Sequence, residues 1–150
     1  MTAPDACKII VVDDDAGVRD SLDALLGAKG YACELFASAE AFLDQHDAAD
    51  PAIILMDYSL GNMSGMQAIQ TVRANDDTRP IIMITAHGDV ALAVKAMRAG
   101  ATDFIEKPWD KDALFNAIER ASDNARAAAE LAQARRQALD AILSFTPREK

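Results

Sequence analysis

The chain has 150 residues, of which 51% are hydrophobic and 26% charged, and its formal net charge is -9. This length suits one domain, and the apolar content is too high for a disordered acidic chain. The acidity argues against binding to nucleic acid or an anionic membrane by charge alone, and no apolar run reaches the roughly 18 residues of a membrane helix. The first residues lack the features of a secretory signal. Cys7 and Cys33 are too few for a disulfide framework or a zinc site.

Charge and composition divide the chain into two parts. Residues 1–120 contain 10 Lys or Arg and 20 Asp or Glu, a net charge of -10, whereas residues 121–150 contain 5 and 4, a net charge of +1. The second part also has nine alanines and no glycine. Because alanine is the best helix former, we expect an acidic globular domain followed by a helical tail.

Short apolar runs and helical patterns alternate along the globular part. Continuous apolar runs are typical of strands buried on both faces, and apolar residues spaced by three and four indicate helices. In chain order, the pattern predicts a strand at 8–12, a helix containing Val18 to Leu26, a strand at 31–36, a short helix from Ser38 to about Gln45, a strand at 52–56, a helix around Met66 to Val72, a strand at 81–84, a helix capped by Asp89 and ended by Gly100, a strand at 102–105 and a last helix from Asp110. This alternation predicts an α/β fold, a doubly wound parallel sheet with helices on both faces.

Polar residues follow four of the five predicted strands. Asp13 and Asp14 come after the first strand, Asp57 after the third, Thr85 after the fourth and Lys107 after the fifth. Ligands of such folds bind beyond the carboxyl ends of the strands. We therefore expect these side chains to share one crevice.

Taken alone, each of these residues has a plainer interpretation. The acids that begin at Asp13 are equally a helix cap with solvated neighbours, and Asp57 is equally a turn former. Thr85 is equally an ordinary strand end, and Lys107 an ordinary surface lysine. Their coincidence at the ends of successive strands favours a common site.

The chemistry of such a cluster is specific. Carboxylates held together repel one another, and a bound cation relieves that repulsion. Oxygen ligands suit Mg2+, and a carboxylate can itself act as a nucleophile and form an aspartyl phosphate. Transfer of a phosphoryl group then needs positive charge and hydrogen-bond donors, which Mg2+, Lys107 and Thr85 would supply.

The same residues carry a resemblance to a known family. Asp13-Asp14, Asp57, Thr85-Ala86 and Lys107-Pro108 resemble the signature of the receiver domains of bacterial two-component response regulators, over about residues 8–122. The segments 85–90 and 104–108 resemble the FixJ-type branch. The resemblance implies a flavodoxin-like (βα)5 sheet with strand order 2-1-3-4-5 and an extended C-terminal helix.

The resemblance also implies a role for each acid. Asp57 matches the phosphoacceptor, Asp14 the direct Mg2+ ligand and Asp13 its partner. The backbone carbonyl of Ser59 matches the third protein ligand of the metal. The resemblance then implies that the chain gains and loses its own phosphoryl group and is not an enzyme that acts on external substrates.

The remaining positions match the switch of the family. Lys107 matches the lysine that pairs with the phosphoryl group, Thr85 the switch hydroxyl and Phe104 the switch aromatic. In the family these two move together and repack the face of the fourth helix, fifth strand and fifth helix, which often dimerises. Ser59 and His87 lie where the family tunes dephosphorylation, although a solvated loop imidazole explains His87 equally well.

The loop after Asp57 departs from the family pattern. It reads Leu60-Gly61 where the family usually has Met-Pro. Because glycine costs more backbone entropy to order than proline does, we expect a more mobile loop and looser Mg2+ binding.

The tail allows two interpretations. A stripe from Leu114 to Ile142 alternates spacings of three and four, as a coiled coil requires, but Arg135 interrupts it. A solvated extension of the last helix is equally consistent with the Ala-rich composition. We expect a receiver domain over 1–122 and a helical linker over 123–144. Because Phe-Thr-Pro-Arg-Glu resembles the opening of the LuxR-type helix-turn-helix domain, we expect residues 145–150 to be the start of such a domain, the rest of which this chain lacks.

The resemblance implies a sensor histidine kinase and a second copy of the chain as partners, DNA contact only through the missing domain, no membrane contact and a bacterial cytoplasmic location. Two alternatives remain. One is a stand-alone receiver that acts in a phosphorelay or by protein binding. The other is a Mg2+-dependent phosphatase on a similar sheet, but its Asp-x-Asp motif would place an acid where Ser59 stands.

Overall fold

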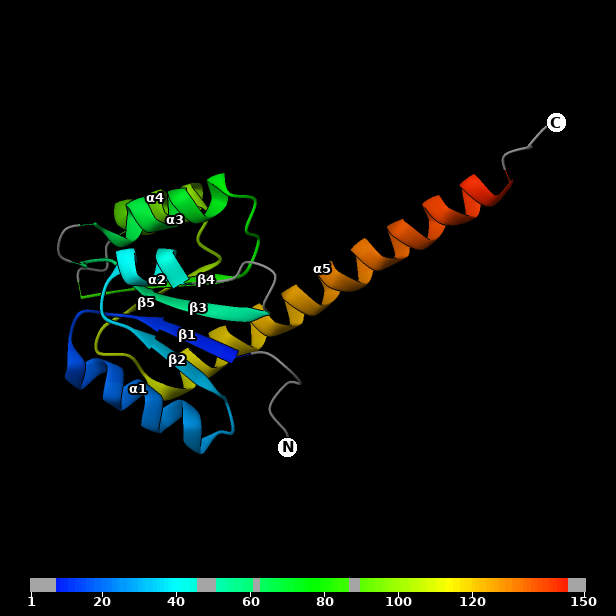
Figure 1. Ribbon diagram of the computed structural model, residues 1–150. Helices are drawn as coiled ribbons and strands as arrows, with labels where there is room; N and C mark the ends of the chain where they lie inside the picture. Colours follow the sequence, from blue (N-terminus) through cyan, green and yellow to red (C-terminus); the bar gives the residue numbers. More distant parts are fainter. Residues whose placement is uncertain (1–7, 46–50, 61–62, 87–89, 146–150) are drawn as a thin grey trace.

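The computed structural model describes residues 8–45, 51–60, 63–86 and 90–145. The elements in chain order are β1 (Lys8–Val12), α1 (Ala16–Ala28), β2 (Cys33–Phe36), α2 (Ala39–Gln45), β3 (Ala52–Asp57), α3 (Gly65–Ala74), β4 (Ile81–Thr85), α4 (Val90–Ala99), β5 (Asp103–Glu106) and α5 (Lys111–Phe145). The five strands form one parallel sheet in the order β2-β1-β3-β4-β5, as Figure 1 shows. The predicted doubly wound fold and its strand order are therefore confirmed.

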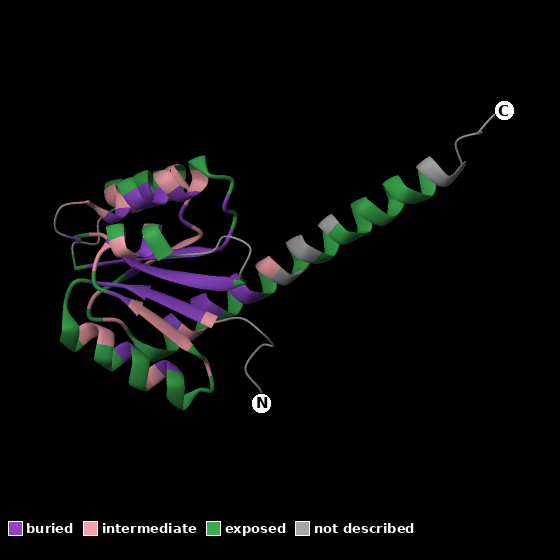
Figure 2. Ribbon diagram, in the orientation of Figure 1, coloured by how far each residue is buried: buried purple, intermediate pink, exposed green. Residues whose placement is uncertain are grey.

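Alternate residues of each strand face opposite layers of helices. One set of strand side chains packs with α2, α3 and α4, and the other set packs with α1 and α5. The two layers lie on opposite sides of the sheet in Figure 1. Because both faces are covered, the central strands β1, β3 and β4 are almost entirely buried (Figure 2), which explains why their sequences are continuous apolar runs.

The register of the sheet brings the strand ends into line. Val12 at the end of β1 pairs with Met56, the residue before Asp57. Asp57 pairs in turn with Ile84 on β4, and Thr85 pairs with Glu106, the residue before Lys107. The polar residues that follow these strands consequently meet at one edge of the sheet.

Four predicted strands have boundaries that differ from the structure, and two of them, β3 and β4, extend one residue further, to Asp57 and Thr85. β2 begins at Cys33 rather than Tyr31, because the Tyr31 N–H donates to the carbonyl of Leu26 at 3.1 Å and closes the end of α1. β5 covers 103–106 rather than 102–105. Just before it, the Thr102 N–H donates to the Ile81 carbonyl at 2.7 Å and the Thr102 hydroxyl accepts the N–H of Ile81 at 3.1 Å. The predicted cap at Asp89 lies outside the described residues.

The last helix, α5, continues without a break for 35 residues. Its first part packs on the sheet through Leu114, Ile118 and Ala121, which are at most 1% exposed. Figure 1 shows the second part projecting past the amino ends of the strands, away from the edge where the polar residues meet. Leu139 and Ile142 are 56% and 62% exposed there, so the structure is consistent with both a solvated helix and a coiled coil that needs a second chain. Residues 146–150 of the helix-turn-helix resemblance lie outside the described part.

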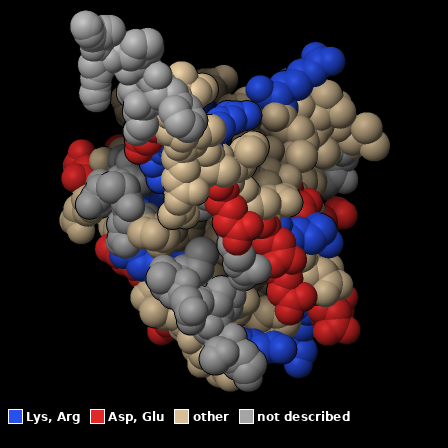
Figure 3. Space-filling model, turned by 90° about the vertical axis from the view of Figure 1, so that its right-hand side faces the viewer, with Lys and Arg blue, Asp and Glu red and all other residues tan. Residues whose placement is uncertain are grey.

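The surface carries charges of both signs. On the face drawn in Figure 3, basic side chains lie in several separate places instead of forming one large patch. Within the described residues, none of the helices combines the length and the apolar character needed to cross a membrane.

Candidate functional site

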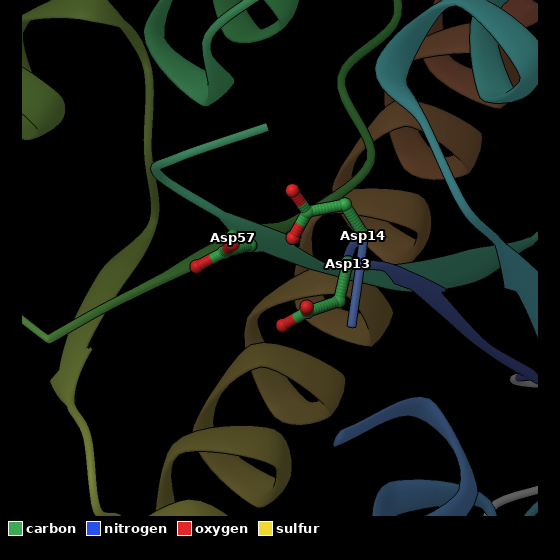
Figure 4. A group of neighbouring side chains, drawn as sticks. All are labelled: Asp13, Asp14 and Asp57. Carbon is green, nitrogen blue, oxygen red and sulfur yellow. The ribbon is translucent and has the colours of Figure 1, made fainter. Parts of the chain in front are cut away.

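Three carboxylates meet where β1 and β3 end. Asp13 and Asp14 directly follow β1, and Asp57 is the last residue of β3. One oxygen from each lies within 4.8 Å of the others, and Figure 4 shows the three side chains at the ends of these strands. Asp13 and Asp57 are only 3% and 5% exposed, whereas Asp14 is exposed. The predicted convergence of these acids is confirmed geometrically.

The turn between β1 and α1 separates the roles of three successive acids. The Asp15 side chain caps α1 by accepting the N–H groups of Gly17 at 2.8 Å and Val18 at 3.3 Å. The Asp15 N–H in turn donates to Asp13 Oδ1 at 2.9 Å. The cap interpretation therefore applies to Asp15, while Asp13 and Asp14 are left for the shared site.

Lys107 brings a cation to this cluster from the end of β5. Its Nζ lies 3.2 Å from Asp13 Oδ2 and 3.1 Å from Asp57 Oδ1. The backbone N–H of Lys107 also donates to the carbonyl of Thr85 at 2.6 Å, which ties the ends of β4 and β5 together. The Lys107–Pro108 peptide bond is cis. Lys107 is thus no ordinary surface lysine, because its ammonium bridges two nearly buried carboxylates.

The surroundings of Asp57 disfavour its ionised form. Burial is the main cause and the charge of Asp13 the next, Lys107 opposes them and Asp14 adds least, and together they raise the pKa of Asp57 from 3.8 to about 6. Burial alone would lower the pKa of the Lys107 ammonium, but its interactions with Asp57 and Asp13 outweigh burial, so this pKa is raised. A site that disfavours its own ionised carboxylate favours an additional cation.

Thr85 and Phe104 occupy neighbouring strands beside the acids. Thr85 is 1% exposed at the end of β4, and Phe104 on β5 is half-buried against the core on the α2, α3 and α4 side. Ser59 is exposed two residues after Asp57, and His87 lies outside the described residues. Of the predicted site residues that the structure describes, Asp13, Asp14 and Lys107 lie around Asp57 and Thr85 ends the adjacent strand, while the roles assigned to all of them remain predictions.

One glycine that the sequence analysis left without a role fixes the backbone of Asp57. The first residue of α3 is Gly65, where an added Cβ would lie 2.4 Å from the Asp57 carbonyl oxygen. Its N–H donates to the carbonyl of Tyr58 at 2.9 Å, and Ser64 with Gln67 forms a capping box before it. Only a residue without a side chain allows α3 to begin so close to Asp57. Of the two positions where the loop departs from the family, Leu60 is 3% exposed, and Gly61 lies outside the described residues.

Comparisons with known proteins agree with this geometry. The profile described as "Response regulator receiver domain" matches residues 9–119. The transcriptional regulatory protein FixJ of Bradyrhizobium diazoefficiens is 38% identical over 142 residues, which cover 95% of this chain and 69% of that protein. FixJ of Rhizobium meliloti is 42% identical over 118 residues, which cover 79% of this chain and 58% of that protein. The matches thus span 58% to 69% of the length of these two regulators.

Solved structures give the same result. A structure of the response regulator StyR aligns with a TM-score of 0.85 at 34% identity and covers 95% of this chain and 72% of that one. A crystal structure of FixJ-N aligns with a TM-score of 0.72 at 41% identity and covers 81% of this chain and 96% of that one. Fold, acidic cluster and sequence similarity together show that the chain belongs to the response regulator receiver domain family.

Proposed function

We propose that Asp57 accepts a phosphoryl group from a phosphohistidine of a sensor histidine kinase. A carboxylate oxygen of Asp57 forms a bond to phosphorus while the bond between phosphorus and the histidine nitrogen breaks, and water later cleaves the acyl phosphate. The observation that carries the proposal is the position of Asp57, which is 5% exposed beside two further carboxylates and the Lys107 ammonium. The chain modifies only itself and acts on no external metabolite.

The donor set around Asp57 fits Mg2+. It consists of carboxylate oxygens, the ligands this hard ion prefers, and the pKa of Asp57 is raised by burial first and by the charge of Asp13 second. Asp13, Asp14, Asp57 and the backbone carbonyl of Ser59 would hold the ion. When bound, Mg2+ supplies positive charge to the phosphoryl oxygens.

The residues of the chain perform the remaining tasks. The Lys107 ammonium, already 3.1 Å from Asp57 Oδ1, would move its hydrogen bond to a phosphoryl oxygen. The Thr85 hydroxyl would donate to another phosphoryl oxygen, and Phe104 on the adjacent strand would turn into the space that Thr85 leaves. Since the Thr85 carbonyl is bonded to the Lys107 N–H, a movement of one strand end reaches the other.

The face that responds to this switch includes α4. Val90, Val94 and Met97 follow one another at helical spacing on α4 and are 80%, 43% and 46% exposed. Such a row of exposed apolar side chains supports the proposal that two phosphorylated chains associate through this face. The projecting part of α5 offers a second surface for the same association.

Transcriptional output is the proposed end of the pathway. It is supported by the FixJ relatives, which are named transcriptional regulatory proteins, and we propose that the chain acts in the bacterial cytoplasm together with its kinase. Contact with DNA would then be made outside the receiver domain. We favour this output over a stand-alone receiver because of that similarity. A phosphatase of the Asp-x-Asp type has no support from it, and Ser59 stands where that motif needs its second acid.

Incubation with Mg2+ and acetyl phosphate tests the proposal. We expect the wild-type chain to gain a phosphoryl mass in Mg2+ and not in EDTA, and Asp57→Asn to gain none under either condition. Asp20→Asn, which removes an exposed acid of α1, is the matched control and should behave like the wild type. A phosphoryl mass that persists in Asp57→Asn contradicts the assignment.

A further inference from the structure

The two carboxylates contributed by the β1–α1 turn depend on a small set of hydrogen bonds. The Asp13 N–H donates to the carbonyl of Phe36 on β2 at 3.1 Å, and the Asp15 N–H donates to Asp13 Oδ1 at 2.9 Å. Asp14 lies between them and is exposed. Among the described residues, none donates a hydrogen bond to the Asp14 carboxylate, so its position depends on the backbone of the turn.

Arg19 completes the support of this backbone. Its Nη1 reaches back from the first turns of α1 and donates to the carbonyl oxygen of Asp13 at 2.7 Å. Its own N–H donates to the Asp15 carbonyl at 3.0 Å as part of the helix. The Asp13 carbonyl belongs to the planar peptide unit that joins Asp13 to Asp14. A bond that fixes this oxygen therefore fixes the unit from which both side chains leave.

Arg19 and Lys107 provide positive charge in different ways. Lys107 binds carboxylate oxygens of Asp13 and Asp57 directly, so a metal ion must compete with it for these atoms. Arg19 binds a carbonyl instead and leaves the carboxylate oxygens available. A guanidinium is always charged, and its hydrogen bond to the carbonyl is charge-assisted, so Arg19 holds the backbone of Asp13 without occupying a carboxylate oxygen that could bind the metal.

We propose that Arg19 is a positioning residue for Mg2+ binding, which holds the Asp13–Asp14 peptide unit in the orientation that presents both carboxylates to the ion. This inference rests on the proposed function. It assigns to Arg19 no contact with the ion, the phosphoryl group or the phosphodonor. Its effect should appear in the affinity for Mg2+ and not in the rate of phosphorylation once Mg2+ is saturating.

Calorimetric titration of the purified chain with Mg2+ tests the proposal. We expect Arg19→Ala to weaken Mg2+ binding by roughly tenfold, as loss of a group that orients metal ligands typically does. Arg19→Gln keeps a donor without the charge and Arg19→Lys keeps the charge without the planar fork, so both should lie between the wild type and Arg19→Ala. Arg98→Ala, which removes the same charge from an exposed site on α4, should bind as the wild type does.

Two further measurements separate positioning from a general structural role. Thermal unfolding in EDTA should show similar midpoints for Arg19→Ala and the wild type, and the rate of phosphorylation by acetyl phosphate should recover at saturating Mg2+. Equal Mg2+ affinities of Arg19→Ala and the wild type would overturn the inference while leaving the proposed function intact. A wild-type chain that binds no Mg2+ would overturn both.

Discussion

The acidic site should lower the stability of the metal-free protein, and Asp57→Asn should reveal by how much. The pKa of Asp57 is about 6 in the folded chain against an ordinary value of 3.8. The folded state therefore holds the Asp57 proton more tightly than the unfolded state does, and stability falls as the pH rises from 3.8 to 6. Above this window, a pKa difference of this size corresponds to about 3 kcal/mol.

Asparagine has nearly the shape of the protonated acid and cannot ionise, so Asp57→Asn should remove this cost. We expect the variant to be more stable than the wild type by about 3 kcal/mol at pH 7.5 in EDTA, which raises the midpoint of thermal unfolding by roughly 6 to 12 °C. Below pH 3.8, where both side chains are neutral, the difference should vanish.

Urea unfolding followed by circular dichroism at pH 7.5, 5.5 and 3.5 measures this difference. Asp20→Asn removes one exposed acid without a nearly buried neighbour and should change stability by less than about 0.5 kcal/mol. Saturating Mg2+ should reduce the advantage of Asp57→Asn, because the ion stabilises the folded wild type. An Asp57→Asn variant no more stable than the wild type at pH 7.5 would refute the reasoning about repulsion at this site.

Three further variants test how the fold supports the site. Gly65→Ala forces a Cβ to 2.4 Å from the Asp57 carbonyl oxygen and should destabilise the fold by about 2 kcal/mol. Gly27→Ala adds a Cβ that meets nothing within 4 Å and should stabilise the fold by about 0.5 kcal/mol. Equal urea midpoints for the two variants would contradict this expectation. Asp77→Ala leaves the Arg79 guanidinium buried without its carboxylate and should cost about 3 kcal/mol or more in unfolding free energy. Asp103→Ala breaks the more exposed pair with Arg120 and a hydrogen bond from the Phe104 N–H, and should cost only about 1 kcal/mol. Similar costs for the two variants would contradict the larger contribution expected of the buried pair. Burial and Asp23 raise the pKa of the Cys33 thiol to about 11. In a Cys7→Ser background, iodoacetamide should therefore alkylate Cys33 on the order of a hundredfold more slowly at pH 8 than it alkylates a free cysteine. Alkylation at the rate of a free cysteine would contradict the raised pKa.

The sequence was sufficient for the sheet and for the convergence of the acids. The apolar runs that end in Asp57 and Thr85 identify buried parallel strands. Parallel strands bring their carboxyl ends to one edge of the sheet for any conformation of the connecting loops. Burial on both faces leaves little freedom in these segments. This explains why the parallel sheet and the cluster of Asp13, Asp14 and Asp57 were predicted correctly, whereas the strand order was implied by the family resemblance.

Contacts between distant segments could not be predicted in the same way. Arg73 on α3 donates two hydrogen bonds to the Gly100 carbonyl, at 3.0 and 2.7 Å, across 27 positions of sequence. Nothing near Arg73 in the sequence indicates this partner. Asp77 and Arg79 are close in the sequence, but other segments of the fold bury their side chains to 1% and 7% exposure, so the local sequence does not predict that this ion pair is buried. The close approach of Gly65 to Asp57 likewise depends on where α3 begins.

The central claim is that the phosphoryl group resides on Asp57. Borohydride reduces an acyl phosphate to an alcohol, so treatment of the phosphorylated chain should convert the modified aspartate to homoserine. Peptide mass spectrometry of the wild-type chain after incubation with acetyl phosphate and Mg2+ then locates the site. We predict homoserine at position 57 alone, and homoserine at Asp13 or Asp14 with an unmodified Asp57 would contradict the account.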